Sequence, residues 1–195
     1  SDDVAFSIQS KLIIDPFAKA HRRTSSERIM KLQSLSFQSS KRSLSELLIN
    51  NPGGLDLGAF SAGRNLTRNE FKSIETELDI KLVVCRNITW GLLRTKWNSF
   101  IEKTVKRVQL WHRKFPNDAG IPIKDLISDL GLGVPNFVAI EIFQDCVRLG
   151  KLKSIRNLIY DFEHSSIPAF DETSWKKVEK FFIVKQYKPP SMLEL

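Results

Sequence analysis

The sequence lacks the features of most membrane-embedded and secreted proteins. It has no apolar run long enough to span a bilayer and no signal peptide, so we expect a cytoplasmic protein without a membrane partner. Only two cysteines are present, Cys85 and Cys146, and each lies in an apolar run that suits a buried free thiol. A disulfide between them stays open on sequence alone, although it would not suit a cytosolic protein.

The sequence also has few of the residues that catalysis needs. Its three histidines, His21, His112 and His164, are far apart, and none has a cysteine or second histidine at metal-ligand spacing. There is no CxxC pair, no P-loop motif, and no serine or cysteine in a nucleophile elbow. We therefore predict that the chain is not an enzyme and has no catalytic, cofactor-binding or metal-binding residues.

Positive charge is present and is concentrated in two blocks. The formal net charge is +8. Residues 19–42 contain seven basic residues and one carboxylate, and residues 94–114 contain the same numbers. The rest of the chain is therefore net acidic. Such blocks indicate a polyanionic partner, most often nucleic acid or the ribosome. The alternative is a basic surface that only keeps the protein soluble.

One pattern occurs twice and begins a third time: an apolar helix end, a proline break, a short turn and a new apolar period. The prolines that mark it are Pro52, Pro116 and Pro189. Their step of roughly 65–75 residues is longer than a solenoid repeat and suits a small helical module. Because the third copy stops soon after it begins, we expect the chain to be a fragment of a longer protein.

These features predict a mainly helical α+β chain of tandem winged-helix modules, which are helix-turn-helix units with small β wings. The predicted parts are the tail of an upstream β-domain (residues 1–18), module 1 (19–88), module 2 (89–170) and the start of a truncated third winged helix (171–195). Residues 87–93 are predicted to be a short linker. We expect Trp90 in this linker, and Trp97 after it, to lie in the contact between the modules.

In module 1, a hydroxyl followed three residues later by a glutamate marks helix starts at Thr24, Ser43 and Thr67. A short helix is expected from Leu55, and the β-branched run of residues 80–85 predicts a strand. This order is typical of a winged helix.

In module 2, apolar spacing predicts a long helix over residues 93–115 and further helices over 123–130 and 136–149. A wing of two short strands should follow over residues 152–162, turning at Arg156-Asn157.

Ten basic residues are candidates for contact with nucleic acid. They are Arg22, Arg23, Lys96, Lys103, Lys106, Arg107, Lys114, Lys151, Lys153 and Arg156. Patches of this kind suit phosphate contact without base readout. The third helix of module 2 carries Glu141 and Asp145, which would repel phosphate, so we do not expect it to read a groove.

Three sets of motifs resemble one protein family in the same order. They are Leu12-Ile13-Ile14-Asp15-Pro16-Phe17-Ala18 with Arg22-Arg23 and Glu27-Arg28, Leu55-Asp56-Leu57-Gly58-Ala59-Phe60 with Asn65-Leu66-Thr67, and Trp97 with Leu110-Trp111-His112-Arg113-Lys114-Phe115-Pro116 and Gly120-Ile121. The first set resembles the junction after the third domain of the SelB family, the second resembles its first winged helix, and the third resembles its second winged helix. These are the bacterial selenocysteine-specific translation elongation factors. The resemblance covers nearly the whole chain.

The resemblance implies a parent with a GTPase and tRNA-binding body followed by four winged helices, of which the last two hold the mRNA hairpin that recodes UGA. This chain would be the monomeric connecting arm between body and hairpin. Its partners, through the parent, would be selenocysteinyl-tRNA, the selenocysteine-insertion mRNA hairpin and the ribosome. GTP would bind only in the N-terminal domain that the chain does not contain.

Two other functions stay open. A winged-helix transcription regulator would read DNA with its third helix, where Arg68, Asn69, Lys72 and Ser73 of module 1 would face outward. A protein-interaction module would instead lack RNA affinity and expose a large apolar patch.

Overall fold

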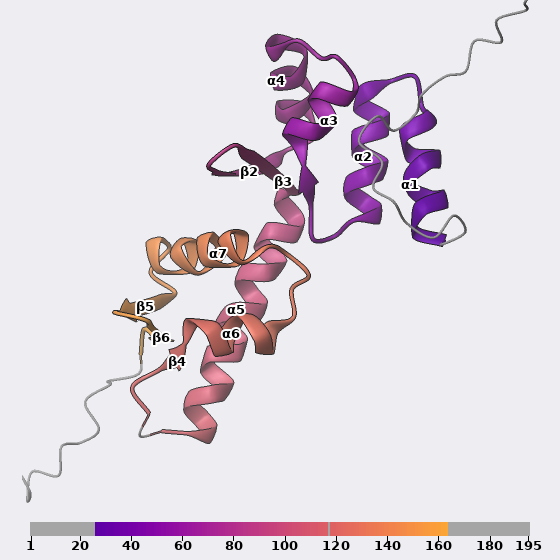
Figure 1. The fold of residues 1–195 in the computed structure, drawn as a ribbon. Coiled ribbons are helices and arrows are strands. Elements are labelled where there is room, and N and C mark those ends of the chain that lie inside the picture. Colours follow the sequence, from indigo (N-terminus) through magenta and orange to yellow (C-terminus); the bar gives the residue numbers. More distant parts are fainter. Residues whose placement is uncertain (1–25, 117, 164–195) are drawn as a thin grey trace, which may run out of the picture. The chain divides into compact units, whose positions relative to one another are not determined.

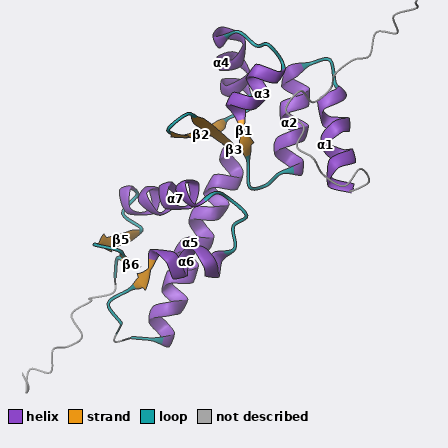
Figure 2. Cartoon of the chain, viewed as in Figure 1, coloured by secondary structure: helices purple, strands orange, loops and turns teal. Residues whose placement is uncertain are grey.

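The computed structural model describes residues 26–116 and 118–163, which fall into two compact units (Figure 1). Unit 1 is the described part of Ser1–Ser99 together with Gly133–Val138, and unit 2 is Phe100–Leu132 together with the described part of Ala139–Leu195. Helices predominate among these residues, beside two small antiparallel sheets (Figure 2). The predicted mainly helical α+β class is confirmed.

Unit 1 consists of two packed helices, a short strand, two more helices and a β-hairpin. In chain order these are α1 (Ser26–Ser36), α2 (Ser40–Asn50), β1 (Leu55–Asp56), α3 (Leu57–Gly63), α4 (Arg68–Glu77), β2 (Ile80–Cys85) and β3 (Ile88–Leu93). In its core, three buried leucines of α2 cluster with Leu57 and Phe60 of α3 and with Ile80 of β2. The base of the β2–β3 hairpin packs against these helices, and its tip points away from them (Figure 1).

Unit 2 repeats the order of unit 1 from α2 onward. Its elements are α5 (Arg94–Lys114), β4 (Ile121–Pro122), α6 (Ile123–Leu130), α7 (Asn136–Arg148), β5 (Leu152–Ile155) and β6 (Leu158–Asp161). The first residues of α5 and of α7 belong to unit 1. From α2 and from α5, the chain therefore runs twice through helix, strand, helix, helix, strand and strand.

The two sheets share one topology, in which the last strand is central. The strand orders are β1-β3-β2 and β4-β6-β5, and all pairs are antiparallel. The two-residue strand lies against the central one in both sheets, with Leu55 opposite Gly91 and Ile121 opposite Ile159. The described residues thus contain an internal structural repeat.

A glycine with positive φ precedes the short strand in each unit. The φ of Gly54 is 82° and that of Gly120 is 152°. A Cβ on Gly54 would lie 2.4 Å from the carbonyl oxygen of Gly91, and a Cβ on Gly120 would lie 2.8 Å from that of Ile159. Both positions therefore require glycine for the same reason, which is the close approach of the chain to the central strand.

The two hairpins turn through the same dipeptide, Arg86-Asn87 and Arg156-Asn157. The φ of Arg86 is 53° and that of Arg156 is 54°, whereas neither asparagine has a positive φ. A two-residue hairpin loop that is left-handed only at its first residue favours glycine there. For a residue with a side chain this conformation costs about 1–2 kcal/mol. Each unit keeps a strained arginine at its hairpin tip.

The predicted helix start at Thr67 is confirmed as a capping box. Thr67 Oγ1 accepts a hydrogen bond from the backbone N–H of Glu70 (3.3 Å), and the Glu70 carboxylate accepts one from the backbone N–H of Thr67 (2.8 Å). The hydrogen bond from the Thr67 hydroxyl, then that from its N–H, holds the pKa of Glu70 below its ordinary value.

The predicted helix start at Ser43 is wrong. The helix begins at Ser40 and is capped by Ser39, and Ser43 is buried within it. The Arg64 guanidinium donates to Ser43 Oγ (2.7 Å) and also to the carbonyl oxygens of Leu35 (2.5 Å) and Phe37 (2.9 Å). Ser43 thus helps to hold the arginine that satisfies carbonyl groups at and after the end of α1.

The helix expected from Leu55 begins two residues later. Residues 55 and 56 pair with β3 instead, and the Asp56 carboxylate caps α3 by accepting from the N–H groups of Gly58 (2.9 Å) and Ala59 (3.3 Å). The capping requirement and the strand pairing together move the helix start.

The linker predicted over residues 87–93 is wrong, because Ile88–Leu93 form the central strand β3. Trp90 on this strand donates its Nε1–H to the carbonyl oxygen of Gly53 (2.9 Å) and packs edge-on against Phe137, with 6.4 Å between ring centroids. Trp97 is buried, and the Lys81 ammonium lies 5.0 Å from its ring centroid. All five residues belong to unit 1. The expectation that Trp90 and Trp97 lie between the modules stays a prediction.

The helices predicted over residues 93–115, 123–130 and 136–149 and the two short strands predicted over residues 152–162 are confirmed to within about two residues. Helix α7 ends at a left-handed Gly150, whose N–H bonds to the Val147 carbonyl oxygen while that of Lys151 bonds to the Cys146 carbonyl oxygen. The predicted upstream β-domain tail, the cap at Thr24 and the truncated third copy lie outside the described residues.

We predict that Gly54→Ala and Gly120→Ala each destabilise the chain by about 1–3 kcal/mol, because a Cβ at either site meets the central strand and strains the left-handed backbone. Urea unfolding followed by circular dichroism measures the change. Gly58→Ala is the matched control, since Gly58 lies within a helix with a negative φ and a Cβ there would meet only the Asp56 carboxylate, a side chain, at 3.2 Å; its effect should stay below about 1 kcal/mol. Equal effects at all three positions would contradict the prediction.

Candidate nucleic-acid interface

Most of the predicted basic candidates are exposed on α5 or on the hairpin of β5 and β6. The exposed ones are Lys96, Lys103, Lys106, Lys114, Lys151, Lys153 and Arg156. Arg107 is only half-exposed, whereas Arg22 and Arg23 lie outside the described residues. A polyanion can reach the exposed side chains without displacing any packed group.

Helical spacing places Lys103, Arg107 and Lys114 on one face of α5. Arg107 forms an ion pair with Asp129 of α6, which offsets its charge. Lys103 and Lys114 have no carboxylate partner among the described residues and lie instead over the rings of Phe100 (6.0 Å) and Phe115 (5.2 Å). Two of the three charges therefore remain available on this face.

An open hollow of about 490 Å³ lies on a neighbouring face of α5. It is lined by Glu102, Val105, Lys106, Gln109, Leu110, Arg113 and, from just before β5, Lys151. Three cations and one carboxylate make it net positive, and Leu110 is 45% exposed. The hollow brings together Lys106 and Lys151, which are far apart in the sequence.

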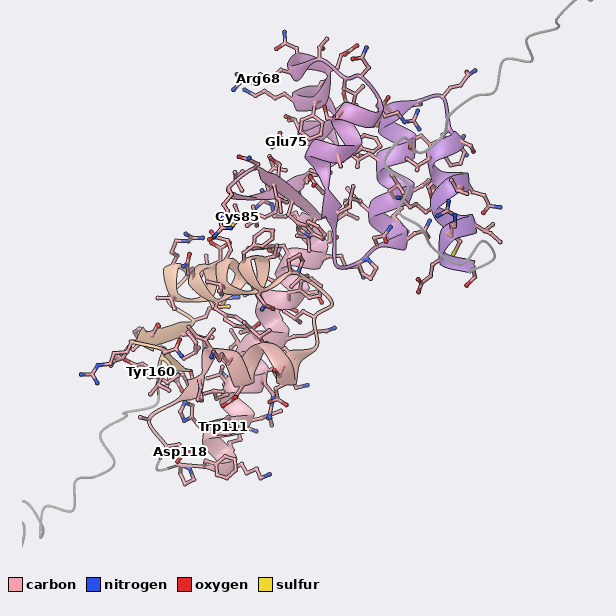
Figure 3. The ribbon with its side chains drawn as sticks, viewed as in Figure 1. Arg68, Glu75, Cys85, Trp111, Asp118 and Tyr160 are labelled. Atoms are coloured by element: carbon pink, nitrogen blue, oxygen red, sulfur yellow. The ribbon has the colours of Figure 1, made fainter. Side chains whose placement is uncertain are left out.

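The C-terminal end of α5 combines aromatic rings with cations. The ring centroids of Trp111 and Phe115 lie 4.6 Å apart, and the Arg107 guanidinium lies 6.0 Å from the Trp111 centroid. Figure 3 shows Trp111 near this end of the helix. Cations beside aromatic faces are the groups that single-stranded nucleic acid uses for charge pairing and stacking.

The β5–β6 hairpin of unit 2 carries candidate basic residues both along strand β5 and at its turn. Lys153 on β5 lies over the Phe162 ring at 4.3 Å, and Arg156 occupies the turn. Arg156 makes no ion pair or hydrogen bond within the part of the chain that the structure describes. Its guanidinium is therefore available to a ligand.

Helix α7 presents paired charges. Arg148 donates hydrogen bonds to Glu141 (2.5 Å) and to Asp145 (2.5 and 2.9 Å), and these bonds hold its pKa above the ordinary value. One cation and two carboxylates leave one net negative charge, which is unfavourable for a phosphate.

Helix α4 exposes the four residues expected to face outward, Arg68, Asn69, Lys72 and Ser73. Arg68 projects away from the helix (Figure 3). The Ser73 hydroxyl donates to Glu77 (3.1 Å), and Lys41 pairs with the same carboxylate (2.5 Å). The hydrogen bond from Lys41, then that from Ser73, holds the pKa of Glu77 below its ordinary value. The helix therefore offers cations and carboxylates together.

Sequence reasoning missed two exposed arginines. Arg113 lines the hollow, and its place two helical turns after Lys106 could have revealed it. Arg86 occupies the tip of the first hairpin, and the repetition of Arg-Asn at the two turns was the signal. Both signals depend on knowing where the elements begin and end.

Within the described ranges, no helix is long and apolar enough to cross a membrane. No group of histidine, cysteine, aspartate and glutamate side chains in that same part of the chain is placed to hold a metal ion. Cys85 and Cys146 are both free thiols.

No protein-family model matches the sequence, and no curated protein matches it at a significant level.

We predict that Cys146 does not react with a thiol reagent in the folded chain. It is fully buried, and burial raises its pKa to about 12. Only the thiolate is nucleophilic, so at about pH 8 a colorimetric disulfide reagent should label one thiol, that of half-exposed Cys85, and a second only after unfolding.

Cys85→Ser is the control and should abolish native labelling. The unfolded chain releases the Cys146 proton near 9.0 and the folded chain only near 12, so this group also lowers the free energy of unfolding as the pH rises through that interval. Rapid labelling of two thiols in the folded chain would contradict the prediction.

Proposed function

We propose that the chain is the connecting arm of a selenocysteine-specific translation elongation factor, built from two winged-helix modules. The observation that carries the proposal is the order helix, strand, helix, helix, strand, strand with a central last strand, found in both units. This order is typical of winged helix-turn-helix modules. The motif resemblance to the SelB family supplies the parent protein.

The arm links the tRNA-binding GTPase body to the domains that hold the selenocysteine-insertion hairpin. In this proposal it performs no catalysis, and GTP binds elsewhere in the parent. Its partners are the RNAs that the parent carries and contacts: selenocysteinyl-tRNA, the mRNA hairpin and ribosomal RNA.

The charge distribution supports phosphate contact without base readout. Helix α4 carries three glutamates, and α7 has one net negative charge in its cluster around Arg148. Net positive charge lies instead on α5 and on the hairpins. Cations outside the third helix hold RNA by its backbone and add salt-dependent affinity.

A sequence-specific DNA-binding regulator is the second candidate. The exposure of Arg68, Asn69 and Lys72 on α4 favours it, because this helix would enter a major groove. It requires a DNA duplex bound more tightly than RNA, with affinity that depends on Lys72.

We predict weak RNA binding that ignores sequence and collapses with salt. Fluorescence anisotropy at two salt concentrations should give equal affinity for a selenocysteine-insertion hairpin and a scrambled RNA. The paired substitution Lys103→Gln and Lys114→Gln should lower the slope of log affinity against log salt by about two, because each phosphate contact contributes about one.

The matched control is Lys72→Gln with Lys124→Gln, which removes the same charge from exposed positions on α4 and α6. It should leave the slope nearly unchanged. Tight binding that prefers the hairpin, or a DNA duplex bound in a Lys72-dependent manner, would contradict the proposed function.

A further inference from the structure

The strongest unexplained feature is the pair of arginines at the two hairpin tips. Turn chemistry favours glycine at the first position of such a loop, yet each unit places an arginine there, with φ values of 53° and 54°. A single residue other than glycine at this left-handed position could be a peculiarity of one turn. Here arginine takes the place of glycine at equivalent positions of two repeats. This repetition indicates that the arginine side chain itself is needed.

No intramolecular contact accounts for either arginine. Both are exposed, and neither makes a hydrogen bond, ion pair or ring contact with another described residue. The exposed arginine Arg148, by comparison, is bound by two carboxylates of its own helix. The tip arginines therefore do nothing for the fold that would offset the strain of their turns.

We infer that Arg86 and Arg156 are two equivalent contacts for the backbone of double-stranded RNA, one at the tip of each hairpin. This inference rests on the proposed function and names residues through which the arm would hold RNA. A guanidinium donates two parallel hydrogen bonds to one phosphate, which a lysine cannot do.

In this inference the residues around each turn suit the minor groove of an RNA duplex, because each turn also carries an exposed apolar side chain. An exposed isoleucine lies in the strand pair next to each turn: Ile88, which follows the first turn, is 41% exposed, and Ile155, which precedes the second, is 53% exposed. The minor groove of A-form RNA is wide and shallow and displays sugars beside its phosphates. A hairpin tip that carries one arginine, with an exposed isoleucine in the adjoining strand pair, can contact both the phosphates and the sugars.

Glycine substitution separates the two roles of the tip residue. Arg86→Gly and Arg156→Gly remove the side chain and relax the turn, so each should raise the melting temperature by about 2–8 °C. A melting temperature that falls would show that the arginine stabilises the turn, and it would overturn the inference.

The same variants are then titrated with a labelled RNA stem-loop of unrelated sequence at several salt concentrations. Each glycine substitution should lower the salt slope by about one, and the double variant by about two. Arg→Lys at both tips keeps the charge and should keep the slope while weakening affinity. Lys124→Gln is the control for net charge and should change neither the slope nor the melting temperature.

The outcomes separate this inference from the proposed function. If the wild-type chain binds RNA and the glycine variants bind equally well, the inference is overturned while the proposed function stands. If the glycine variants lose RNA but the α5 variants do not, the tips are supported and the role of α5 is wrong. If the wild-type chain binds no RNA, both fail. A tip-dependent preference for DNA duplexes over RNA would also overturn the inference.

Discussion

Each unit depends on one close approach, between the backbone before its short strand and the central strand of its sheet. Glycine is required there, because any Cβ at Gly54 or Gly120 would meet a carbonyl oxygen. The approach lets β1 pair with β3 and β4 pair with β6, which ties the following helix to the hairpin. The arginine at each tip is thereby held at a defined distance from the helices of its own unit.

The elements predicted correctly from the sequence are those that depend only on residues near one another in the chain. The capping box at Thr67 and the apolar periods of α5, α6 and α7 are written in consecutive residues, so these helices could be found from sequence. Strand β3 could not, because Gly91 breaks its β-branched pattern. That glycine is needed because a Cβ there would lie 2.2 Å from Leu57 Cδ1 of another element. The helix start predicted at Ser43 is wrong for a similar reason, because the role of Ser43 depends on Arg64, which is remote in sequence.

The positive charge of the candidate interface could be predicted from the sequence, but the ion pairs that offset part of this charge could not. Composition identified α5 and the second hairpin as basic. It could not show that Asp129 of α6 offsets Arg107, or that Arg148 holds Glu141 and Asp145 on α7, because these pairs form only through side-chain geometry. Arg86 was missed because β3, the strand after its turn, is predicted from the sequence as a linker, so the turn is not expected to be a hairpin tip like the one at Arg156.

The central claim is that RNA is held through α5 and the hairpin tips, not through helices α4 and α7. The most direct measurement is a nuclear magnetic resonance titration of the ¹⁵N-labelled chain with an RNA stem-loop. The account predicts amide shift changes at residues 86–87 and 156–157 and along the exposed face of α5, with little change over residues 68–77. Changes concentrated on residues 68–77, or none at all, would contradict it.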